Sequence, residues 1–487
     1  MKTYSSECTG KNRKWLFLIT VLIALLGLTS CKSCTKPNTG SISGSVILEN
    51  DTADSGLDPI DFTGITISLY QTVGLDTTLV RLNGAYPGIG VTLDQELGFD
   101  PTAAEPVFST TTDAAGDYVF KEVPYGSYNL IGSKDGWGTV FRYDINVANN
   151  NETSVVNFTM YPLVTLDSYI DSPITFKQDH TYKALNDVSI VGSCSFLGNS
   201  RINLARNVQI SIFGEITSDI DSGYTHFSPL DTGSRSDEYY RWNTIRIYSN
   251  NQSLHNMFCW GATTGISLLG NDCTVSNSYF RLSDDGIYAG APRTNILNCS
   301  FDSMASKAVF YDQGVNSPTI NHVLENNVIY NCLNGLRTQG QAIRIKNNYF
   351  ISNSNAIFSF STFYHIIENN NFDQNETAII CAGTQIPIQF NNFFENPVSI
   401  DLSGAWYGGV TQPTMNNNNF YQRTGYAIKV LPLMTQSKDF DATLSYWKAT
   451  DIDAIIYDNL DYAPVYQRVI YLPKRNQPVA NCGIQLN

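Results

Sequence analysis

The chain has 487 residues, which is enough for two or three domains. Its composition is 42% hydrophobic but only 15% charged, so we expect a globular protein in which asparagine, serine, threonine and tyrosine fill the polar positions. The formal net charge of −14 argues against nucleic acids and anionic lipid surfaces as partners, because their phosphates would repel the protein.

The N-terminal 30 residues have the pattern of a targeting segment. A basic region with Lys11 and Lys14 precedes the apolar run WLFLITVLIALLGLTS, which has the length of a signal peptide. The run ends in Leu28-Thr29-Ser30-Cys31, which resembles the lipobox of bacterial lipoproteins. That resemblance implies removal of residues 1–30 and diacylation of Cys31, whose acyl chains would anchor the protein in a membrane. The alternative is an ordinary signal peptide followed by an incidental cysteine.

Residues 31–40 form a short polar tether, and residues 41–161 have the pattern of a β-sandwich. Alternating runs such as SISGSVIL, GITISLYQT and GDYVFKEV are separated by Gly, Asp and Pro, as short strands are. The run TTTDAAGDYVFKEVPYGSYNLIGSKDGW resembles the carboxypeptidase-regulatory-like, prealbumin-type sandwich, apart from an insertion near residues 74–106. The resemblance implies a stalk or spacer without a peptidase site.

A repeat of about 21 to 22 residues runs through residues 162–440. An asparagine recurs three residues before an aromatic or aliphatic residue, and a small residue with an aliphatic one follows after seven to eight more. This period is too short for helical hairpins and suits one coil of a parallel β-helix. We expect the asparagines to stack ~4.8 Å apart, each amide donating to the next carbonyl. The expected asparagine column comprises Asn277, Asn298, Asn326, Asn347, Asn369, Asn391 and Asn417.

The pattern NN.F followed by (A/G)I resembles the repeats of right-handed parallel β-helices of the pectin-lyase-like superfamily. The resemblance implies an apolar core inside the coils. It also implies that the tail, residues 441–487, caps the stack and protects its last coil from pairing with other chains. The predicted fold is therefore all-β: an N-terminal sandwich, a right-handed parallel β-helix and a short C-terminal cap.

Many members of that superfamily degrade polysaccharides, and two motifs here resemble those of polygalacturonases. Asp284 and Asp285 lie in SDDGI, and Arg344 and Lys346 lie in RIK. Inverting hydrolysis needs two carboxyl groups about 6.5–9.5 Å apart, with basic residues to hold an acidic sugar. Two further motifs of that family are missing from the neighbouring coils. Turn formation by Asp285 and a charge column through Lys346 are the structural alternatives.

No spacing of potential ligands indicates a metal or another cofactor. The cysteines form no CxxC pair, and the five histidines are scattered along the chain. His322 and His365 fall in one column but two coils apart, which is too far for one metal ion. We expect the cysteines to be small buried hydrophobic residues.

Aromatic residues in two loops are the candidate ligand contacts. Trp406 and Tyr407 lie in AWYGG, and Tyr239 and Tyr240 lie in DEYYRW. Aromatic rings stack on the apolar faces of sugars, although they can equally cover the flank of the coils. The sequence thus predicts a lipid-anchored protein of the bacterial cell envelope, at the outer membrane or cell surface, that binds or displays a polysaccharide or a surface protein. The alternative is a polysaccharide hydrolase or lyase with a diverged site.

Overall fold

The computed structural model describes most of the chain from residue 38 onward. The described residues are 38–49, 61–148, 153–219, 223–230, 240–312, 322–339, 342–363, 365–384, 386–402, 413–422, 424–431, 439–462, 465 and 467–486. The leader segment and Cys31 therefore lie outside the described residues. Among the helices that are described, none has the length and apolar character needed to span a bilayer.

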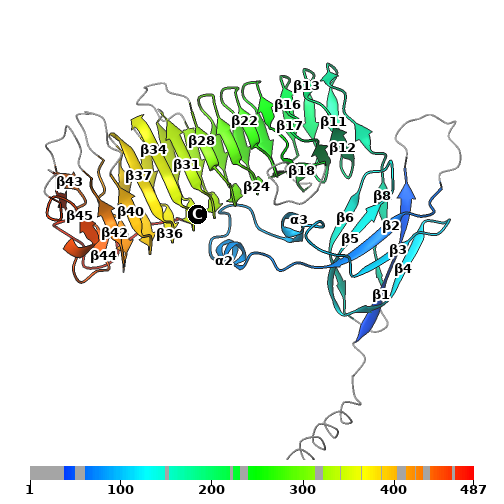
Figure 1. The fold of residues 1–487 in the computed structure, drawn as a ribbon, viewed down its shortest axis with the longest axis horizontal. Helices are drawn as coiled ribbons and strands as arrows, with labels where there is room; N and C mark the ends of the chain where they lie inside the picture. The colour runs from blue at the N-terminus through cyan, green and yellow to red at the C-terminus, as the bar shows by residue number, and fades with distance from the viewer. Residues whose placement is uncertain are drawn as a thin grey trace, which may run out of the picture.

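The first domain is a β-sandwich of two four-stranded sheets (Figure 1). One sheet has the order β4-β1-β7 with β8 paired to β1, and the other has the order β3-β2-β5-β6. The strands are β1 (Thr39–Leu48), β2 (Thr66–Gln71), β3 (Phe108–Thr111), β4 (Asp117–Pro124), β5 (Gly126–Ser133), β6 (Val140–Val147), β7 (Thr153–Val155) and β8 (Phe158–Met160). Ile42, Ile67 and Leu130 are fully buried in its core. In the turn before β4, the carboxylate of Asp113 accepts hydrogen bonds from the backbone N–H groups of Ala115 and Asp117.

The second domain is a parallel β-helix, as the repeat predicted. Each coil contributes strands to sheets that run the length of the domain, which we name sheets A, B and C. Sheet A consists of β10 (Tyr169–Ile170), β13 (Val188–Ile190), β16 (Ile210–Ile212), β19 (Ile245–Ile247), β22 (Thr264–Leu268), β25 (Asp285–Ala289), β28 (Lys307–Tyr311), β31 (Asn334–Gln339), β34 (Asn355–Phe363), β37 (Thr377–Thr384), β40 (Val398–Asp401), β42 (Tyr426–Lys429) and β45 (Ile456–Tyr457).

Sheets B and C complete the coils. Sheet B consists of β9 (Val164–Thr165), β12 (Thr181–Ala184), β15 (Arg201–Leu204), β18 (Thr225–Pro229), β21 (Met257–Trp260), β24 (Tyr279–Arg281), β27 (Ser300–Asp302), β30 (Val328–Tyr330), β33 (Tyr349–Ile351), β36 (Asn371–Asp373), β39 (Asn392–Phe394), β41 (Asn419–Tyr421) and β44 (Tyr446–Trp447). Sheet C has two parts, β11 (Ile174–Phe176), β14 (Cys194–Phe196) and β17 (Ile216–Ser218), then β20 (Ser253–His255), β23 (Thr274–Ser276), β26 (Asn295–Leu297), β29 (His322–Glu325), β32 (Ile343–Lys346), β35 (Ile366–Glu368) and β38 (Ile388–Gln389).

The corner between sheets C and B turns on a residue in the left-handed backbone conformation. Residues at this corner with φ between +49° and +60° include Asn256, Asn277, Asn298, Asn326, Asn347, Asn369 and Asn417, together with Phe390. Asparagine suits this conformation because its short polar side chain tolerates positive φ. The strands on either side are in register, so Asn326, Asn347 and Asn369 are superposed as predicted.

Two details of the predicted asparagine column are wrong. Asn391 is not a corner residue, because Phe393 rather than Phe394 points into the core and Phe390 takes the corner position. The corner side chains also do not carry the predicted amide ladder. That ladder lies one residue later, where the side chain turns inward, and it consists of Asn327, Asn348, Asn370, Asn391 and Asn418.

The buried ladder satisfies the polar groups of the corner. Its amide-to-carbonyl distances, Nδ2 to the next Oδ1, are 2.9 Å, 3.0 Å, 3.1 Å and 3.2 Å along the column. The Oδ1 of Asn370 also accepts the backbone N–H of Asn348, and its Nδ2 also donates to the carbonyls of Ile345 and Glu368. A buried backbone group without a partner is costly, so this column makes the corner stable.

A second ladder and an aromatic stack fill the other side of the coils. Asn353 donates to Asn375 at 2.9 Å and Asn375 to Asn396 at 3.1 Å, at the corner between sheets B and A. The rings of Phe350, Phe372, Phe393 and Phe420 stack with centroids 5.0 to 5.1 Å apart, and Trp447 continues the stack at 4.4 Å. The core is thus a set of columns of like side chains, one residue from each coil.

The cysteines and two of the histidines belong to this interior. Six described cysteines are buried, Cys482 is half-buried, and all seven are free thiols. His322 and His365 are fully buried. His365 accepts the backbone N–H of Ile343 at 3.2 Å and bonds to the Thr338 hydroxyl at 2.8 Å, so it is a packed and hydrogen-bonded core residue.

The sandwich insertion, residues 74–106, leaves its own domain and lies along sheet B; we call it the strap (Figure 1). It contains α2 (Thr77–Ala85), capped by Asp76, and α3 (Gln95–Gly98), capped by Asp94. Leu79, Leu82 and Ile89 pack in one cluster with Val328, Tyr349 and Ile351 of sheet B. Gly90 approaches so closely, donating to the Asn326 carbonyl at 2.7 Å, that a Cβ there would lie 2.6 Å from Ser300 Oγ.

The stack continues further than the repeat indicated. β44 extends sheet B and β45 extends sheet A, so the predicted boundary at residue 440 is too early. A 3₁₀ turn, η2 (Asp453–Ile455), lies between these last strands, and β43 (Phe440–Asp441) pairs with β46 (Val469–Ile470). The final described residues then turn back along sheet B toward the strap.

Replacing Asn370 by alanine should destabilise the β-helix by at least about 2 kcal/mol, because it leaves several buried groups without partners. The matched control is Asn369→Gly, which keeps the left-handed corner and removes a half-buried side chain whose one hydrogen bond goes outside the coils, to the carbonyl of Asn481. Urea unfolding followed by tryptophan fluorescence measures both. Equal effects of the two substitutions would contradict the assignment of the ladder to the inner column.

Candidate functional site

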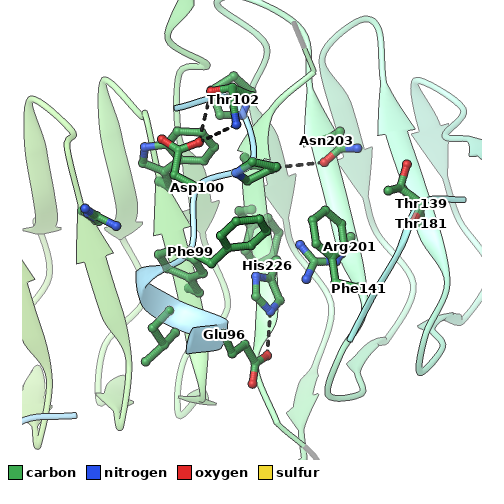
Figure 2. Close-up of a pocket in the computed structure, with 18 of the residues that line it drawn as sticks. Glu96, Phe99, Asp100, Thr102, Thr139, Phe141, Thr181, Arg201, Asn203 and His226 are labelled. Carbon is green, nitrogen blue, oxygen red and sulfur yellow. Dashed lines mark hydrogen bonds and ion pairs between the residues drawn. The ribbon is translucent and has the colours of Figure 1, made fainter. Parts of the chain in front are cut away.

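A crevice of about 160 Å³ lies where the strap, β6 of the sandwich and the first coils of sheet B meet (Figure 2). Phe99, Phe141, Phe258 and Trp260 give it apolar walls. Its polar lining comes from Glu96, Asp100, Thr181, Arg201, Asn203, His226 and Ser228. A second cavity of about 370 Å³ continues past Glu96 and Arg201 along β6. The opening is therefore built by three segments that are distant in the sequence.

Strand register places the sheet B side chains. Arg201, His226 and Phe258 pair in one column across β15, β18 and β21. Their neighbours Ile202, Phe227 and Cys259 point into the core, so this column faces outward. Asn203 and Ser228 form the next outward column, where the Ser228 hydroxyl donates to Asn203 Oδ1 at 2.9 Å. The alternation of the strands thus presents two adjacent rows of polar and aromatic groups to the crevice.

Glu96 and His226 form a buried pair between the strap and the β-helix. The Glu96 carboxylate lies 2.8 Å from His226 Nε2 (Figure 2). Burial, together with the charge of Arg201, lowers the pKa of His226 to about 4. Burial raises the pKa of the Glu96 carboxyl, but the hydrogen bond from His226, the nearby charge of Arg201 and the backbone of Tyr224 together lower it below its usual value. At neutral pH a neutral imidazole therefore donates to an ionised carboxylate.

This protonation state leaves Nδ1 of His226 as a hydrogen-bond acceptor. Because Nε2 carries the proton, Nδ1 presents a lone pair, and among the described residues it has no hydrogen-bond partner. An imidazole with a pKa near 4 is a poor general base at neutral pH, because such a base works best with a pKa near the working pH. The dyad is suited to accepting a hydrogen bond from a ligand hydroxyl.

Arg201 is held flat at the boundary of the two cavities. Its guanidinium carbon lies 3.8 Å from the centroid of the Phe141 ring, and its Nη2 donates to the Tyr143 hydroxyl at 2.8 Å. Both partners come from β6, so the sandwich positions a cation that belongs to the β-helix. The planar fork of donors suits ring and hydroxyl oxygens of a polar ligand.

One buried hydroxyl in the lining is unsatisfied. Thr181 is only 2% exposed, and its Oγ1 has no hydrogen-bond partner within the described part of the chain. Buried polar groups are normally paired, so an unpaired hydroxyl beside a cavity marks a position where a bound molecule gains a hydrogen bond. Thr181, Arg201 and His226 occupy successive strands of one outward column.

The four candidate catalytic residues do not converge. Asp284 makes an ion pair with Arg241, and Asp285, the first residue of β25 in sheet A, lies 3.0 Å from Lys307 Nζ. Arg344 and Lys346 belong to β32 in sheet C, where Arg344 Nε lies 3.5 Å from Glu368. Lys346 pairs in register with Glu325 and Glu368, as the charge column predicted. The structure thus places the two motifs on different sheets and does not bring them together, as the polygalacturonase-like alternative would need.

The predicted aromatic contacts fall largely outside the described residues. Trp406, Tyr407 and Tyr239 lie there, whereas Tyr240 is described and half-buried. No group of three or more histidine, cysteine, aspartate or glutamate residues in the described ranges could hold a metal ion. The crevice residues Glu96, Phe99, Arg201 and His226 were not identified from the sequence. The only sequence feature that pointed to this region was the insertion at residues 74–106. The surface on which the insertion docks cannot be recognised from the repeat pattern.

His226 should make the protein acid-sensitive between pH 6.5 and 4. The unfolded histidine binds a proton below pH 6.5, whereas the folded one resists protonation down to about pH 4, so stability falls as the pH falls. At about 1.4 kcal/mol per pH unit, this gap amounts to roughly 3 kcal/mol. His226→Gln, which can still donate to Glu96, should flatten this part of the pH profile.

Thermal unfolding of both proteins at several pH values measures this difference. His365, whose pKa burial lowers to about 3, contributes to both profiles and cancels in the comparison. Parallel profiles for the two proteins would show that His226 is not the group responsible.

Comparisons with known proteins bear on the fold. Residues 285–435 match the family described as the right handed beta helix region, and the solenoid is accordingly right-handed. No curated protein sequence matches the chain significantly. The catalytic unit of a GH87 α-1,3-glucanase from Streptomyces thermodiastaticus is 11% identical, with 92% of this chain and 88% of that chain covered and a TM-score of 0.39.

Two further solved structures are similar over shorter stretches. A mutant tailspike protein of E. coli bacteriophage HK620 in complex with a pentasaccharide is 14% identical, with 64% of this chain and 61% of that chain covered and a TM-score of 0.36. The full-length major pilin SpaD from Corynebacterium diphtheriae is 16% identical over 26% of this chain and 30% of that chain, with a TM-score of 0.16. The chain thus spans less than two thirds of the tailspike and pilin chains.

Proposed function

We propose that the protein is a lipid-anchored component of the bacterial cell envelope that binds a glycan in the crevice between its sandwich and its β-helix. The observation that carries the proposal is the composition of that crevice. Aromatic walls lie beside a neutral imidazole acceptor, a guanidinium and an unpaired hydroxyl. Sugars combine apolar ring faces with hydroxyl groups that both donate and accept, and this lining offers partners for each.

The charges of the crevice favour a neutral or weakly charged sugar. Arg201 lies near Glu96, and Arg142 lies 4.0 Å from Asp179 in the adjoining cavity. Arg281 is likewise close to Asp302, at 3.4 Å. Since these cations have carboxylates nearby, a polyanion gains little net attraction, and recognition rests on hydrogen bonds and ring contacts.

The size of the crevice favours a short part of a glycan. A volume of about 160 Å³ is below the range of pockets for drug-sized ligands, so one sugar ring would enter while the rest of the chain lies along the adjoining cavity. Binding in this way needs no reaction, and the ion-paired Asp284 and Asp285, just before and at the start of β25, have no part in it. The sandwich would act as a spacer that also completes the site.

Trp260→Ala should weaken glycan binding by about tenfold, because it removes one aromatic wall of the crevice. The control is Phe213→Ala, which removes a 47% exposed ring that is not part of the crevice. Titration calorimetry of the full chain in detergent, with ligands selected from an oligosaccharide panel, measures both. Equal affinities for the two variants, or no ligand in the panel, would refute the proposed site.

Cys31→Ser should release the protein from membranes, because it removes the thiol that the lipobox resemblance assigns to acylation. Detergent phase partitioning of cell extracts should then move the protein from the detergent phase to the aqueous phase. Cys34→Ser is the matched control and should leave the partitioning unchanged. An unchanged distribution of the Cys31 variant would rule out this anchor.

A further inference from the structure

The segment that follows the last coil, residues 476–486, crosses the outer face of sheet B in a groove lined by asparagine. Asn371, Asn392 and Asn419 stand one above another on β36, β39 and β41 and face outward. Asn419 Nδ2 donates to Asn392 Oδ1 at 3.0 Å, and Asn392 Nδ2 donates to Asn371 Oδ1 at 3.0 Å. This is a third amide ladder, on the surface of the domain rather than inside it.

The surface ladder and the corner asparagines bind the main chain of the segment. Asn419 accepts the N–H of Val479 at 2.7 Å and donates to its carbonyl at 3.2 Å. Asn369 donates to the carbonyl of Asn481 at 2.7 Å, and Asn392 donates to that of Cys482 at 3.3 Å.

Two further main-chain contacts extend the segment toward the strap. The N–H of Gly483 donates to the Phe390 carbonyl at 2.7 Å, and the N–H of Gln485 donates to Asn347 Oδ1 at 3.2 Å. Main-chain contacts of this kind are largely independent of the bound sequence, as in peptide recognition by strand addition.

Two positions of the segment, in contrast, restrict which residues can bind in the groove. Gly483 has φ of +74°, and a Cβ there would lie 2.1 Å from Asn392 Nδ2 and 2.3 Å from Asn371 Oδ1. Only glycine fits this position. Ile484 packs against the cluster that joins the strap to sheet B, so it serves as an apolar anchor.

We propose that this groove is a binding site for an extended polypeptide with glycine followed by an aliphatic residue, and that residues 476–486 are its resident ligand. The occupant that fits in exchange is the same segment of a second copy of this chain. The contacts lie on the outside of the coils, whereas the buried ladder and the aromatic stack hold the β-helix together. The segment can therefore leave without unfolding the domain that binds it.

The test uses the full-length Gly483→Ala variant, with Gly64→Ala as its matched control. Gly64 has the same φ of +74°, but a Cβ there would meet nothing within 4 Å. Hydrogen exchange of the peptides covering residues 476–486 should accelerate at least tenfold in the first variant and stay unchanged in the second. Protection that persists in Gly483→Ala would overturn the proposal.

A labelled peptide with the sequence of residues 476–486 then probes the vacated groove. It should bind Gly483→Ala at least tenfold more tightly than wild type, whose own segment competes at a high effective concentration. The same peptide with alanine in place of glycine should bind neither protein. Equal binding to both proteins, or equal binding of both peptides, would refute a glycine-selective groove.

If Gly483→Ala fails to fold, a substitution in the groove itself tests the proposal instead. Asn419→Ser removes the acceptor of the Val479 N–H and one donor to the segment without touching the segment itself. Exchange at Val479 should rise in this single variant relative to wild type. Unchanged exchange at Val479 would show that the amide does not hold the segment.

Discussion

The inward-facing asparagine at the corner between sheets C and B is the interaction on which the rest of the molecule depends. A solenoid must turn sharply once per side, and each turn leaves backbone groups that the parallel sheets cannot pair. Asn327, Asn348, Asn370, Asn391 and Asn418 supply those missing partners and bond to each other at the same time. Because these five successive coils repeat the same corner, their strands stay in register, and the aromatic stack and the outward columns follow from that register.

The crevice illustrates how a regular scaffold acquires an irregular site. The β-helix contributes Thr181, Arg201 and His226 at positions fixed by strand register. Those residues alone would form part of a flat, solvated surface. The strap brings Glu96 and Phe99 over them, and β6 brings Phe141 and Tyr143 from the side. Burial between these elements lowers the pKa of His226 and keeps its imidazole neutral, so the site is a property of both domains together.

The sequence predicted the coils well because their information is periodic. Superposed Asn326, Asn347 and Asn369 followed from spacing alone, whereas Asn391 was misplaced because Phe393 and Phe394 are adjacent and only packing distinguishes them. The crevice was not predictable in the same way. Glu96 and His226 are 130 residues apart, and nothing in the spacing of either indicates that the insertion docks on sheet B. The SDDGI and RIK motifs, which resemble a catalytic pattern in the sequence, lie on β25 and β32 of different sheets, and only the fold shows this separation.

The strap would have a mechanical consequence if the protein is held by the proposed N-terminal anchor. Tension would enter at β1, whose hydrogen bonds to β4, β7 and β8 run along most of its length and would be loaded together in shear. The covalent link between the domains is residues 161–163, which bond to the sandwich through Gly136 and Gly138. The strap adds a second connection, because the Gly90 N–H donates to the Asn326 carbonyl and Arg281 donates to the Gly98 carbonyl, several coils away from the link. A force applied at the N-terminus would therefore be transmitted through the strap to several coils, and not through the link between the two domains alone.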